Sequence, residues 1–269
     1  MRLVDLSAGW RTDFIVHRHD GLVVERDDCI VVRTPDNPTF YWGNFLLLPA
    51  LPDDSALEHW LARFDEEIGR LQSASRHRAF GVNAPCAQAE LPRWQRAGFE
   101  LQRSHVMQVD ARGLRAPARP ARGQVLFRPA DLPRESADFV EVQCADTMGH
   151  PVPAYRTFRE RKMAAVARMQ AAGAACWFGL WCDGVLAADC GLVRDGDLGR
   201  FQYVSTHPDW RRRGLCSALV HAVSQWGFVQ WRLRTLTMVA DPDDVAIGIY
   251  RSLGYATTVQ TIGLERGGD

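Results

Sequence analysis

The alternation of apolar and polar positions predicts a chain built from both strands and helices. Between Leu57 and Leu71, apolar residues recur at steps of three and four, which is the spacing of one buried helix face. Further along, three runs of strand-forming residues are separated by Asp-Gly pairs at 183–184 and 195–196, and such pairs favour tight hairpin turns. A hairpin-connected sheet accompanied by helices predicts an α/β protein of the α+β kind.

The first half is expected to contain strands at 22–25, 29–33, 41–48, 79–83 and 99–109, with helices after Ser55 and at 88–97. Ser55 is expected to cap the first of these helices. A Gly43-Asn44 pair predicts a bulge inside the third strand. The buried face of the helix is expected to comprise Leu57, Trp60, Leu61, Phe64, Ile68 and Leu71.

The second half is expected to begin with a strand at 125–128, helices at 134–144 and 154–171, and strands at 175–182, 185–193 and 199–205. A helix, a strand at 234–240, a helix at 242–253 and a strand at 255–264 are expected to follow. The helix that follows 199–205 is expected to bury Leu215, Leu219, Ala222, Trp226 and Val229. Residues 111–124 are rich in Arg, Ala, Pro and Gly, which indicates an exposed linker between domains at 1–110 and 125–269.

Charge and composition narrow the range of partners. The 269 residues contain 32 basic and 32 acidic side chains, so no overall field favours nucleic acid or an anionic membrane. The chain has neither an apolar leader nor a bilayer-spanning run, which predicts a cytoplasmic protein. Its seven cysteines include no CxxC pair, and Cys176, Cys182 and Cys190 are expected to be buried thiols and not metal ligands. We expect no metal, and we expect a monomer or a homodimer.

One stretch, from Val204 to Ser217, has a pattern suited to binding phosphate. A strand ends at a turn containing Pro208, and a basic loop containing Gly214 leads directly into an amphipathic helix. The first amides of a helix have no internal acceptor, and the helix dipole places partial positive charge there. This segment therefore predicts an anion site formed mainly by the main chain.

The same stretch resembles a known sequence motif. Thr206-His207-Pro208-Asp209-Trp210, followed by Arg211-x-x-Gly214-x-Cys216, is similar to motif A of the GNAT acetyltransferase superfamily. Cys216 departs from the Gly or Ala usual in that position. The order of elements from 125 to 265 is also the order of the GNAT fold.

The resemblance implies acetyl-CoA as the acyl donor. Main-chain groups of the strand would contact the pantetheine arm, and the loop and first helical turn would bind the pyrophosphate. The residues implied in cofactor binding are Val204, Ser205, Thr206, Arg211, Arg212, Arg213, Gly214, Leu215, Cys216, Ser217 and Asp243. Asp243 stands where many relatives carry Asn, and a helix N-cap is the other interpretation of this residue.

Two residues are candidates for catalysis. Tyr250 matches a family tyrosine that protonates the departing thiolate, and a phenol with an ordinary pKa near 10 carries a proton at neutral pH; a packing role is the alternative. His150 is the candidate base, although Gly149-His150-Pro151 also reads as an ordinary turn. Residues 199–205 contain no acid, whereas many relatives carry one there. His17 and His19 are expected at the surface.

The first half resembles a degenerate second copy. Its segment from Trp94 to Phe99 has the same helix-Gly-strand pattern as Tyr250 to Tyr255. Where a phosphate-binding loop would be expected, residues 49–54 contain two prolines and two acids. We therefore expect a tandem GNAT protein in which only the C-terminal copy binds the cofactor.

The sequence leads to an acetyl-CoA-dependent N-acetyltransferase acting on a primary amine of a small metabolite by direct attack on the thioester. A non-catalytic acyl-CoA-binding or interaction protein and a protein N-acetyltransferase are the alternatives. The missing strand acid favours a protein without turnover, whereas Arg211, Gly214 and Tyr250 favour an enzyme.

Overall fold

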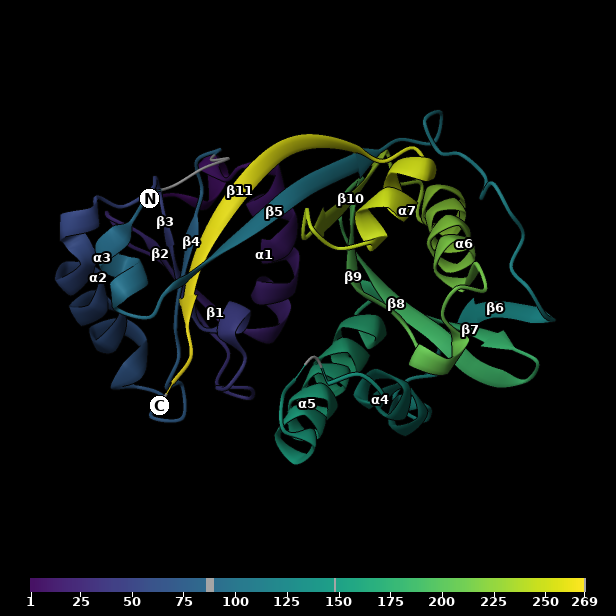
Figure 1. Cartoon of the computed structure of the whole chain (residues 1–269), viewed down its shortest axis with the longest axis horizontal. Coiled ribbons are helices and arrows are strands. Elements are labelled where there is room, and N and C mark those ends of the chain that lie inside the picture. The colour runs from purple at the N-terminus through teal and green to yellow at the C-terminus, as the bar shows by residue number, and fades with distance from the viewer. Residues whose placement is uncertain (86–89, 148, 269) are drawn as a thin grey trace. The chain divides into compact units, whose positions relative to one another are not determined.

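The structure is a computed structural model that describes residues 1–85, 90–147 and 149–268. The chain forms two compact units, one comprising Met1–Val106 with Thr257–Asp269 and the other Met107–Ala256. Figure 1 labels the elements of both. No helix in the described ranges combines the length and apolar character needed to cross a membrane.

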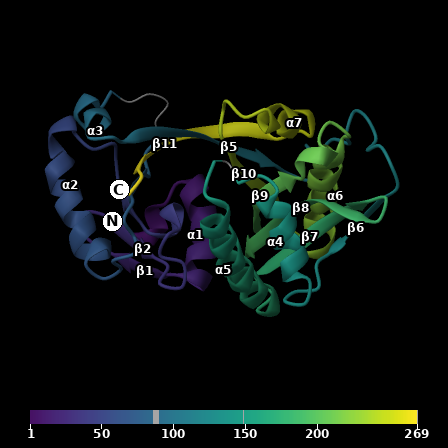
Figure 2. The ribbon, with the colours of Figure 1, turned by 60° about the horizontal axis from the view of Figure 1, so that its bottom comes forward.

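The first unit is a sheet covered by helices on both faces. Its elements are α1 (Ala8–Asp20), β1 (Leu22–Glu25), β2 (Ile30–Arg33), β3 (Phe45–Leu48), α2 (Leu57–Phe64), β4 (Arg78–Val82), α3 (Pro92–Arg96) and most of β5 (Glu100–Val109), with short 3-10 helices at Leu3–Asp5, Tyr41–Gly43 and Asp54–Ala56 and a π-helical turn at Asp65–Gly69. As Figure 2 also shows, α1 lies on the opposite face of this sheet from α2 and α3. Phe14 of α1 packs with Phe45, whereas Phe64 and Trp94 pack with Phe80 on the other face.

The second unit has the same layered construction. Its elements are β6 (Val125–Pro129), α4 (Ser136–Cys144), α5 (Val152–Ala171), β7 (Ala175–Cys182), β8 (Val185–Asp195), β9 (Leu198–Thr206), α6 (Leu215–Gln230), β10 (Thr235–Ala240), α7 (Ala246–Ser252) and the start of β11 (Ala256–Arg266), with a 3-10 turn at Pro208–Trp210. The strand order is β10-β9-β8-β7-β6. Strand β7 buries both its faces: Phe178 packs with α6, and Trp177 packs with α4 and α5.

The final strand of the chain does not stay with the second unit. From Thr257 onward β11 belongs to the first unit, where Gly263–Arg266 pairs antiparallel with Arg78–Gly81 of β4. The sequence-based boundary assigned residues up to 269 to the C-terminal domain. The order of elements alone does not show which strand the final strand pairs with. The last three residues of β5, in turn, belong to the second unit, and Gln108 Nε2 donates to Thr237 Oγ1 of β10 over 3.1 Å.

Most expected elements are present, with corrections in the first half. Helix α1 was not predicted, and His17, expected at the surface, is 3% exposed within it. The expected third strand begins only at Phe45, because Tyr41–Gly43 forms a 3-10 turn and not a bulged strand. The described part of the 88–97 helix is α3, and residues 86–89 lie outside the described ranges.

Two helix predictions also need correction. Ser55 does not cap α2; its amide and hydroxyl instead donate to Asp53, which caps the short helix before α2. Leu71 is 60% exposed and Val229 is 70% exposed, although both were assigned to buried faces. The buried face of α6 is rotated from the expected one and comprises Leu215, Leu219, Val220, Val223, Ser224 and Gly227.

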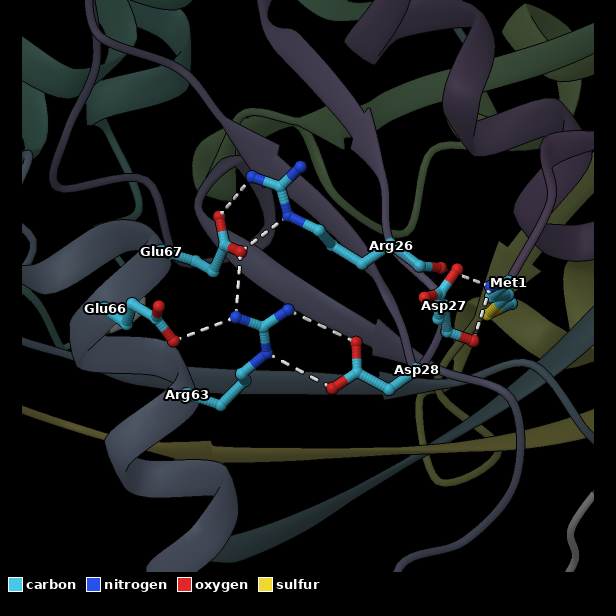
Figure 3. A network of polar contacts seen from close by, with 7 residues as sticks. All are labelled: Met1, Arg26, Asp27, Asp28, Arg63, Glu66 and Glu67. Atoms are coloured by element: carbon cyan, nitrogen blue, oxygen red, sulfur yellow. Dashed lines mark hydrogen bonds and ion pairs between the residues drawn. The ribbon is translucent and has the colours of Figure 1, made fainter.

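A charged network holds α2 against the β1–β2 turn in the first unit (Figure 3). Glu67, whose side chain is 8% exposed, accepts from Arg26 at 2.6 Å and pairs with Arg63 at 3.0 Å. Arg63 also pairs with Asp28 at 3.2 Å and with Glu66 at 2.9 Å. The hydrogen bond from Arg26 lowers the pKa of Glu67, which therefore stays ionised in the folded protein.

Replacing Arg63 is expected to destabilise the protein in a pH-dependent way. Arg63→Gln should lower the free energy of unfolding by about 2 kcal/mol at pH 7, because three carboxylates lose their shared cation. A carboxylate with a lowered folded pKa contributes stability above its ordinary value of about 4.3 and loses that contribution as pH falls through the folded value. The cost of the substitution should therefore shrink by pH 3.

Urea unfolding at pH 7 and pH 3 measures this cost. The matched control is Arg2→Gln, because Arg2 pairs with Glu25 at 3.3 Å but its side chain is 74% exposed. That control should cost about 0.5 kcal/mol or less. Equal costs for the two variants, or a cost for Arg63→Gln that does not change with pH, would contradict the assignment.

Candidate functional site

The candidate site lies where two parallel strands separate. Strand β10 pairs with β9 only from Thr235–Leu198 to Thr237–Arg200, yet β9 continues to Thr206 and β10 to Ala240. Beyond the third pair, the facing main-chain groups no longer satisfy one another. Unpaired strand edges offer both donors and acceptors to a ligand.

A bulge lies in β9 beside this opening. The register between β8 and β9 shifts between Asp189 and Gly191, and Tyr203 has a positive φ of 46°. A bulge changes the direction of side chains and locally bends the strand. Val204 therefore packs toward the α6 core, whereas Tyr203 packs toward the core formed with α4 and α5.

The 211–217 segment closes one end of the opening and leads into α6. Gly214 is the N-cap residue of α6 with φ 79°, and Arg212 has φ 60°. Within the described residues, no acceptor is found for the amides of Arg212, Arg213, Gly214, Leu215, Cys216 and Ser217. These amides lie at the positive end of a helix of 16 residues, where the sequence predicts an anion site.

The three arginines of this segment have different surroundings. Arg211 pairs with Asp146 at 2.5 Å and donates to the Thr206 carbonyl at 3.2 Å, which ties the loop to the end of α4. The Arg213 guanidinium lies 4.5 Å from the centre of the Trp210 ring. Arg212 is exposed. All three were predicted to bind the cofactor, but the charge of Arg211 is already balanced by a carboxylate.

Residues 111–124 pack against the same segment. The Arg115 amide donates to the Leu253 carbonyl, and the Arg122 amide donates to the Arg213 carbonyl, both over 2.9 Å. A Cβ on Gly214 would lie 3.4 Å from the Pro120 carbonyl oxygen. The segment contains no helix or strand, as expected of a linker, but it also forms one wall of the 211–217 loop.

Two side-chain atoms in the part of β9 beyond its last pair with β10 have no partner among the described residues. They are Thr206 Oγ1 and Gln202 Nε2, each buried from solvent. A buried polar atom without a partner costs free energy that a bound ligand can recover. Together with the free amides of the 211–217 segment, they fit a ligand that lies along the strand and ends in a phosphate at the helix.

Tyr250 lies on α7, on the α6 side of the sheet. It is 6% exposed, and burial raises the pKa of its hydroxyl above the ordinary value, with Cys216 and Asp244 adding to the effect. A raised pKa keeps the phenol protonated at neutral pH. Burial likewise raises the pKa of the Cys216 thiol to about 12, so Cys216 is unsuited to act as a nucleophile.

The α4–α5 side carries a separate group of aromatic residues. The ring of His150 stacks on that of Tyr155 at a centroid distance of 5.8 Å, and the hydroxyls of Tyr155 and Tyr203 lie 3.1 Å apart. The Arg159 guanidinium lies 3.5 Å from the centre of the Tyr203 ring. The expected base, His150, is therefore brought to the tyrosines but is itself exposed.

Asp243 is not the N-cap of α7, which was one of its two sequence interpretations. Its amide donates to Asp241 Oδ1, whereas Asp244 Oδ1 accepts from the Ala246 amide at the start of α7, whose N-cap residue is Val245. Asp243 is exposed, because α7 starts later than expected, at Ala246.

Asp189 is a buried acid beside the candidate site that the sequence analysis missed. It is completely buried on β8, opposite Ser205 of β9, and accepts hydrogen bonds from Ser205, Gln143 and Trp177. The search for an acid covered only 199–205 and so passed over β8. A lone carboxylate in the otherwise apolar run from Leu186 to Leu192 was the signal that would have found it.

The predicted core thiols are confirmed. Cys176, Cys182 and Cys190 are all buried, and burial raises the pKa of the Cys176 thiol to about 12. Over the ranges that the structure describes, no group of three or more His, Cys, Asp or Glu side chains is placed to hold a metal ion.

Comparison with known proteins relates the second unit to a known family. Residues 141–255, which carry the separated strands and the 211–217 segment, match the acetyltransferase (GNAT) family. This part of the chain is similar to a GNAT domain. The match covers β7 to α7 with α5 and part of α4, which are the elements that form the candidate site.

A curated relative and two solved structures place the GNAT domain in context. An acetyltransferase of Yersinia pestis is 33% identical over 63 residues, which is 23% of this chain and 45% of the relative, so the match spans less than half of that protein. A GCN5-related N-acetyltransferase from Kribbella flavida matches 96% of this chain and 94% of its own with a TM-score of 0.68 and 16% identity. A tandem GNAT protein from the clavulanic acid biosynthesis pathway matches 82% of this chain and 72% of its own with a TM-score of 0.53 and 14% identity. The GNAT-like fold therefore extends over both units.

Proposed function

We propose that this protein is an acetyl-CoA-dependent N-acetyltransferase that acetylates a primary amine of a small metabolite. The observation that carries the proposal is the row of free amides at the start of α6, placed at the end of two strands that separate after three residue pairs. Members of the GNAT family use acetyl-CoA, and this geometry suits a long, extended ligand that carries a pyrophosphate.

The cofactor would lie along the opening between β9 and β10. Val204, Ser205 and Thr206 would offer main-chain groups to the pantetheine arm, and the 211–217 amides would receive the pyrophosphate. Arg212 and Arg213 would add positive charge at the solvent side. A main-chain amide on the open edge of β9 would donate to the carbonyl oxygen as negative charge develops there.

The two faces of the sheet would then serve different steps. Tyr250, on the α6 side, would donate its proton to the sulfur as the thiolate leaves. The amine would approach from the opposite face of the sheet, where the hydroxyls of Tyr155 and Tyr203 lie close together beside the same part of β9. General acid catalysis of this kind contributes about 10² to 10⁴ in rate.

The first unit is proposed to be a copy without cofactor. Its parallel strands β3 and β4 stay paired to their last residues, Leu48 and Val82, so they leave no opening. The loop after β3 carries carboxylates that already accept from main-chain amides: Asp53 from Ser55 and Asp54 from Arg93, each at 2.8 Å. These acids satisfy the donors that a phosphate would need and would repel it.

The proposal also covers the acceptor amine, the cellular location and the oligomeric state. A small-molecule amine is favoured over a basic protein tail because equal numbers of acidic and basic residues leave no general acidic field. We propose a cytoplasmic monomer or homodimer that needs neither a metal nor nucleic acid. A protein that binds acyl-CoA without turnover is the alternative, and measurements of binding and turnover separate the two.

Substitution of Gly214 is expected to abolish acetyl-CoA binding. Gly214→Glu places a carboxylate among the amides of the 211–217 segment, and calorimetry should show at least a 100-fold loss of affinity, or about 2.7 kcal/mol. The matched control is Gly184→Glu, because Gly184 has φ 82° but nothing within 4 Å of its Cβ position. Both variants carry the same backbone strain, so equal losses of affinity would refute the assignment.

Pro52→Ala serves as a second control for the first unit. Pro52 lies in the loop that corresponds to the 211–217 segment, and its replacement should leave acetyl-CoA affinity unchanged. A loss of affinity comparable to that of Gly214→Glu would show that the first unit also takes part in binding.

Tyr250→Phe is expected to lower kcat by about 100-fold or more while acetyl-CoA affinity stays within a factor of about three. The measurement is release of CoA thiol in the presence of a panel of small primary amines. Tyr255→Phe is the matched control, because Tyr255 is equally buried but its hydroxyl lies 2.8 Å from Ser224 Oγ. Acetyl-CoA binding by the wild-type protein without turnover of any amine would favour the non-catalytic alternative.

A further inference from the structure

Asp189 is a buried acid for which the proposed mechanism has no role. It is fully enclosed, and its Oδ2 accepts from Gln143 Nε2 at 2.5 Å and from Trp177 Nε1 at 2.9 Å. Its other oxygen, Oδ1, accepts from the hydroxyl of Ser205. An enclosed carboxylate is costly to bury, and such groups gather at functional sites more often than elsewhere in a fold.

The partners of Asp189 are of two kinds. Gln143 comes from α4 and Trp177 from β7, and the Trp177 ring fills the space above Gly191 so closely that a Cβ there would lie 2.3 Å from it. Ser205, in contrast, is half-buried and lies on β9 beyond its last pair with β10. The Ser205 hydroxyl therefore joins the enclosed carboxylate to the part of the strand where the proposed reaction takes place.

We infer that Asp189 is the proton acceptor of the acetyl transfer and that the Ser205 hydroxyl conducts the proton from the attacking amine to it. This inference rests on the proposed N-acetyltransferase function. It supplies the carboxylate that is missing from β9 by placing it on the adjacent strand, one cross-strand pair away.

The step balances as follows. The amine nitrogen bonds to the acetyl carbon, and the carbon–sulfur bond breaks. One amine proton passes to Ser205 Oγ as the serine hydroxyl proton passes to Asp189 Oδ1, and the leaving sulfur takes the proton of Tyr250. Asp189 then releases its proton to solvent and Tyr250 regains one, which leaves an amide and free CoA.

The surroundings of Asp189 suit a proton acceptor. Burial raises its pKa above the ordinary value, and the hydrogen bonds from Ser205, Gln143 and Trp177 oppose this effect. The charged and titratable groups that face it are Arg159, which reaches it through Gln143 at 2.7 Å, Tyr203 on β9 and the neighbouring thiol of Cys190. A carboxylate whose pKa lies closer to neutrality accepts a proton more readily.

The arrangement also places the base and the acid on opposite faces of the sheet. Asp189 and Ser205 face the α4–α5 core, whereas Tyr250 belongs to the α6 core on the opposite face of the sheet. The thioester, lying in the opening between β9 and β10, would be reached by one group from each face. Proton removal and proton donation are thereby kept apart.

The test compares Asp189→Asn and Ser205→Ala with a control that removes a different partner of the same carboxylate. Asn fits the same space, and its amide can donate to Ser205 while its oxygen accepts from Gln143 and Trp177. Trp177→Phe removes the hydrogen bond to Oδ2 but leaves the Ser205 connection in place. For each variant, kcat is measured from pH 5 to 9 with the best amine of the panel, together with acetyl-CoA affinity and thermal unfolding.

Asp189→Asn and Ser205→Ala should each lower kcat by about 100-fold or more, and the double variant should lose no more than either alone, because both belong to one proton path. The fall in kcat on the acidic side of the wild-type profile should disappear in Asp189→Asn. Acetyl-CoA affinity should stay within about threefold in all variants. Trp177→Phe should lose much less kcat than Asp189→Asn and should keep the fall on the acidic side, moved to higher pH, because it loses a hydrogen bond that lowers the pKa of Asp189.

Each other outcome has a definite meaning. A folded Asp189→Asn or Ser205→Ala variant with wild-type kcat overturns the inference and leaves the proposed function standing. An equal loss of kcat in Trp177→Phe also overturns it, because the carboxylate then acts only through packing. If Asp189→Asn does not fold, the kcat of Ser205→Ala alone tests the inference. Wild-type protein that binds acetyl-CoA without turnover overturns the proposed function and the inference with it.

Discussion

The structure of the candidate site depends on the parallel pairing of β9 with β10 and on where that pairing stops. Parallel neighbours cannot be joined by a tight turn, so the chain must cross over through a helix, which here is α6. The crossover brings the start of α6 to the end of β9. When the two strands separate after Thr237–Arg200, the open strand edge and the free amides of the helix meet at one place.

The same constraint produces a different result in the first unit. Strands β3 and β4 are also parallel and are also joined through a helix, α2. Their pairing continues to the last residue of each strand, and the Asn83 amide then donates to the Leu48 carbonyl at 2.8 Å, which extends the closed edge. The shared topology thus puts a helix N-terminus next to the ends of two parallel strands in both units. The length of the strand pairing and the acids before the helix determine whether main-chain groups there are left free for a ligand.

Local sequence signals predict some parts of this structure but not others. The helix N-terminus at Leu215 and the turn at Pro208 follow from local signals, because a Pro-containing turn and a Gly before an amphipathic run act over a few residues. Helix α1 was missed since its sequence mixes Thr, Phe, Ile and Val with charged residues and its N-cap, Ser7, makes no side-chain capping bond. Its helical state depends on Phe14 packing with Phe45, a contact that no local pattern contains.

The site residues divide in the same way. The 211–217 segment could be proposed from the sequence because its pattern lies in consecutive residues, but Asp189 and Ser205 are 16 positions apart and meet only through the register of β8 with β9. That register shifts at the bulge near Tyr203, and a slip of one residue would turn Ser205 to the α6 face and away from the carboxylate. The bulge therefore does more than bend the strand. It sets which face of the sheet each later residue of β9 occupies. Val204 therefore packs in the core that contains Tyr250, whereas Ser205 reaches Asp189. The bulge thus keeps the proposed acid and the proposed base apart.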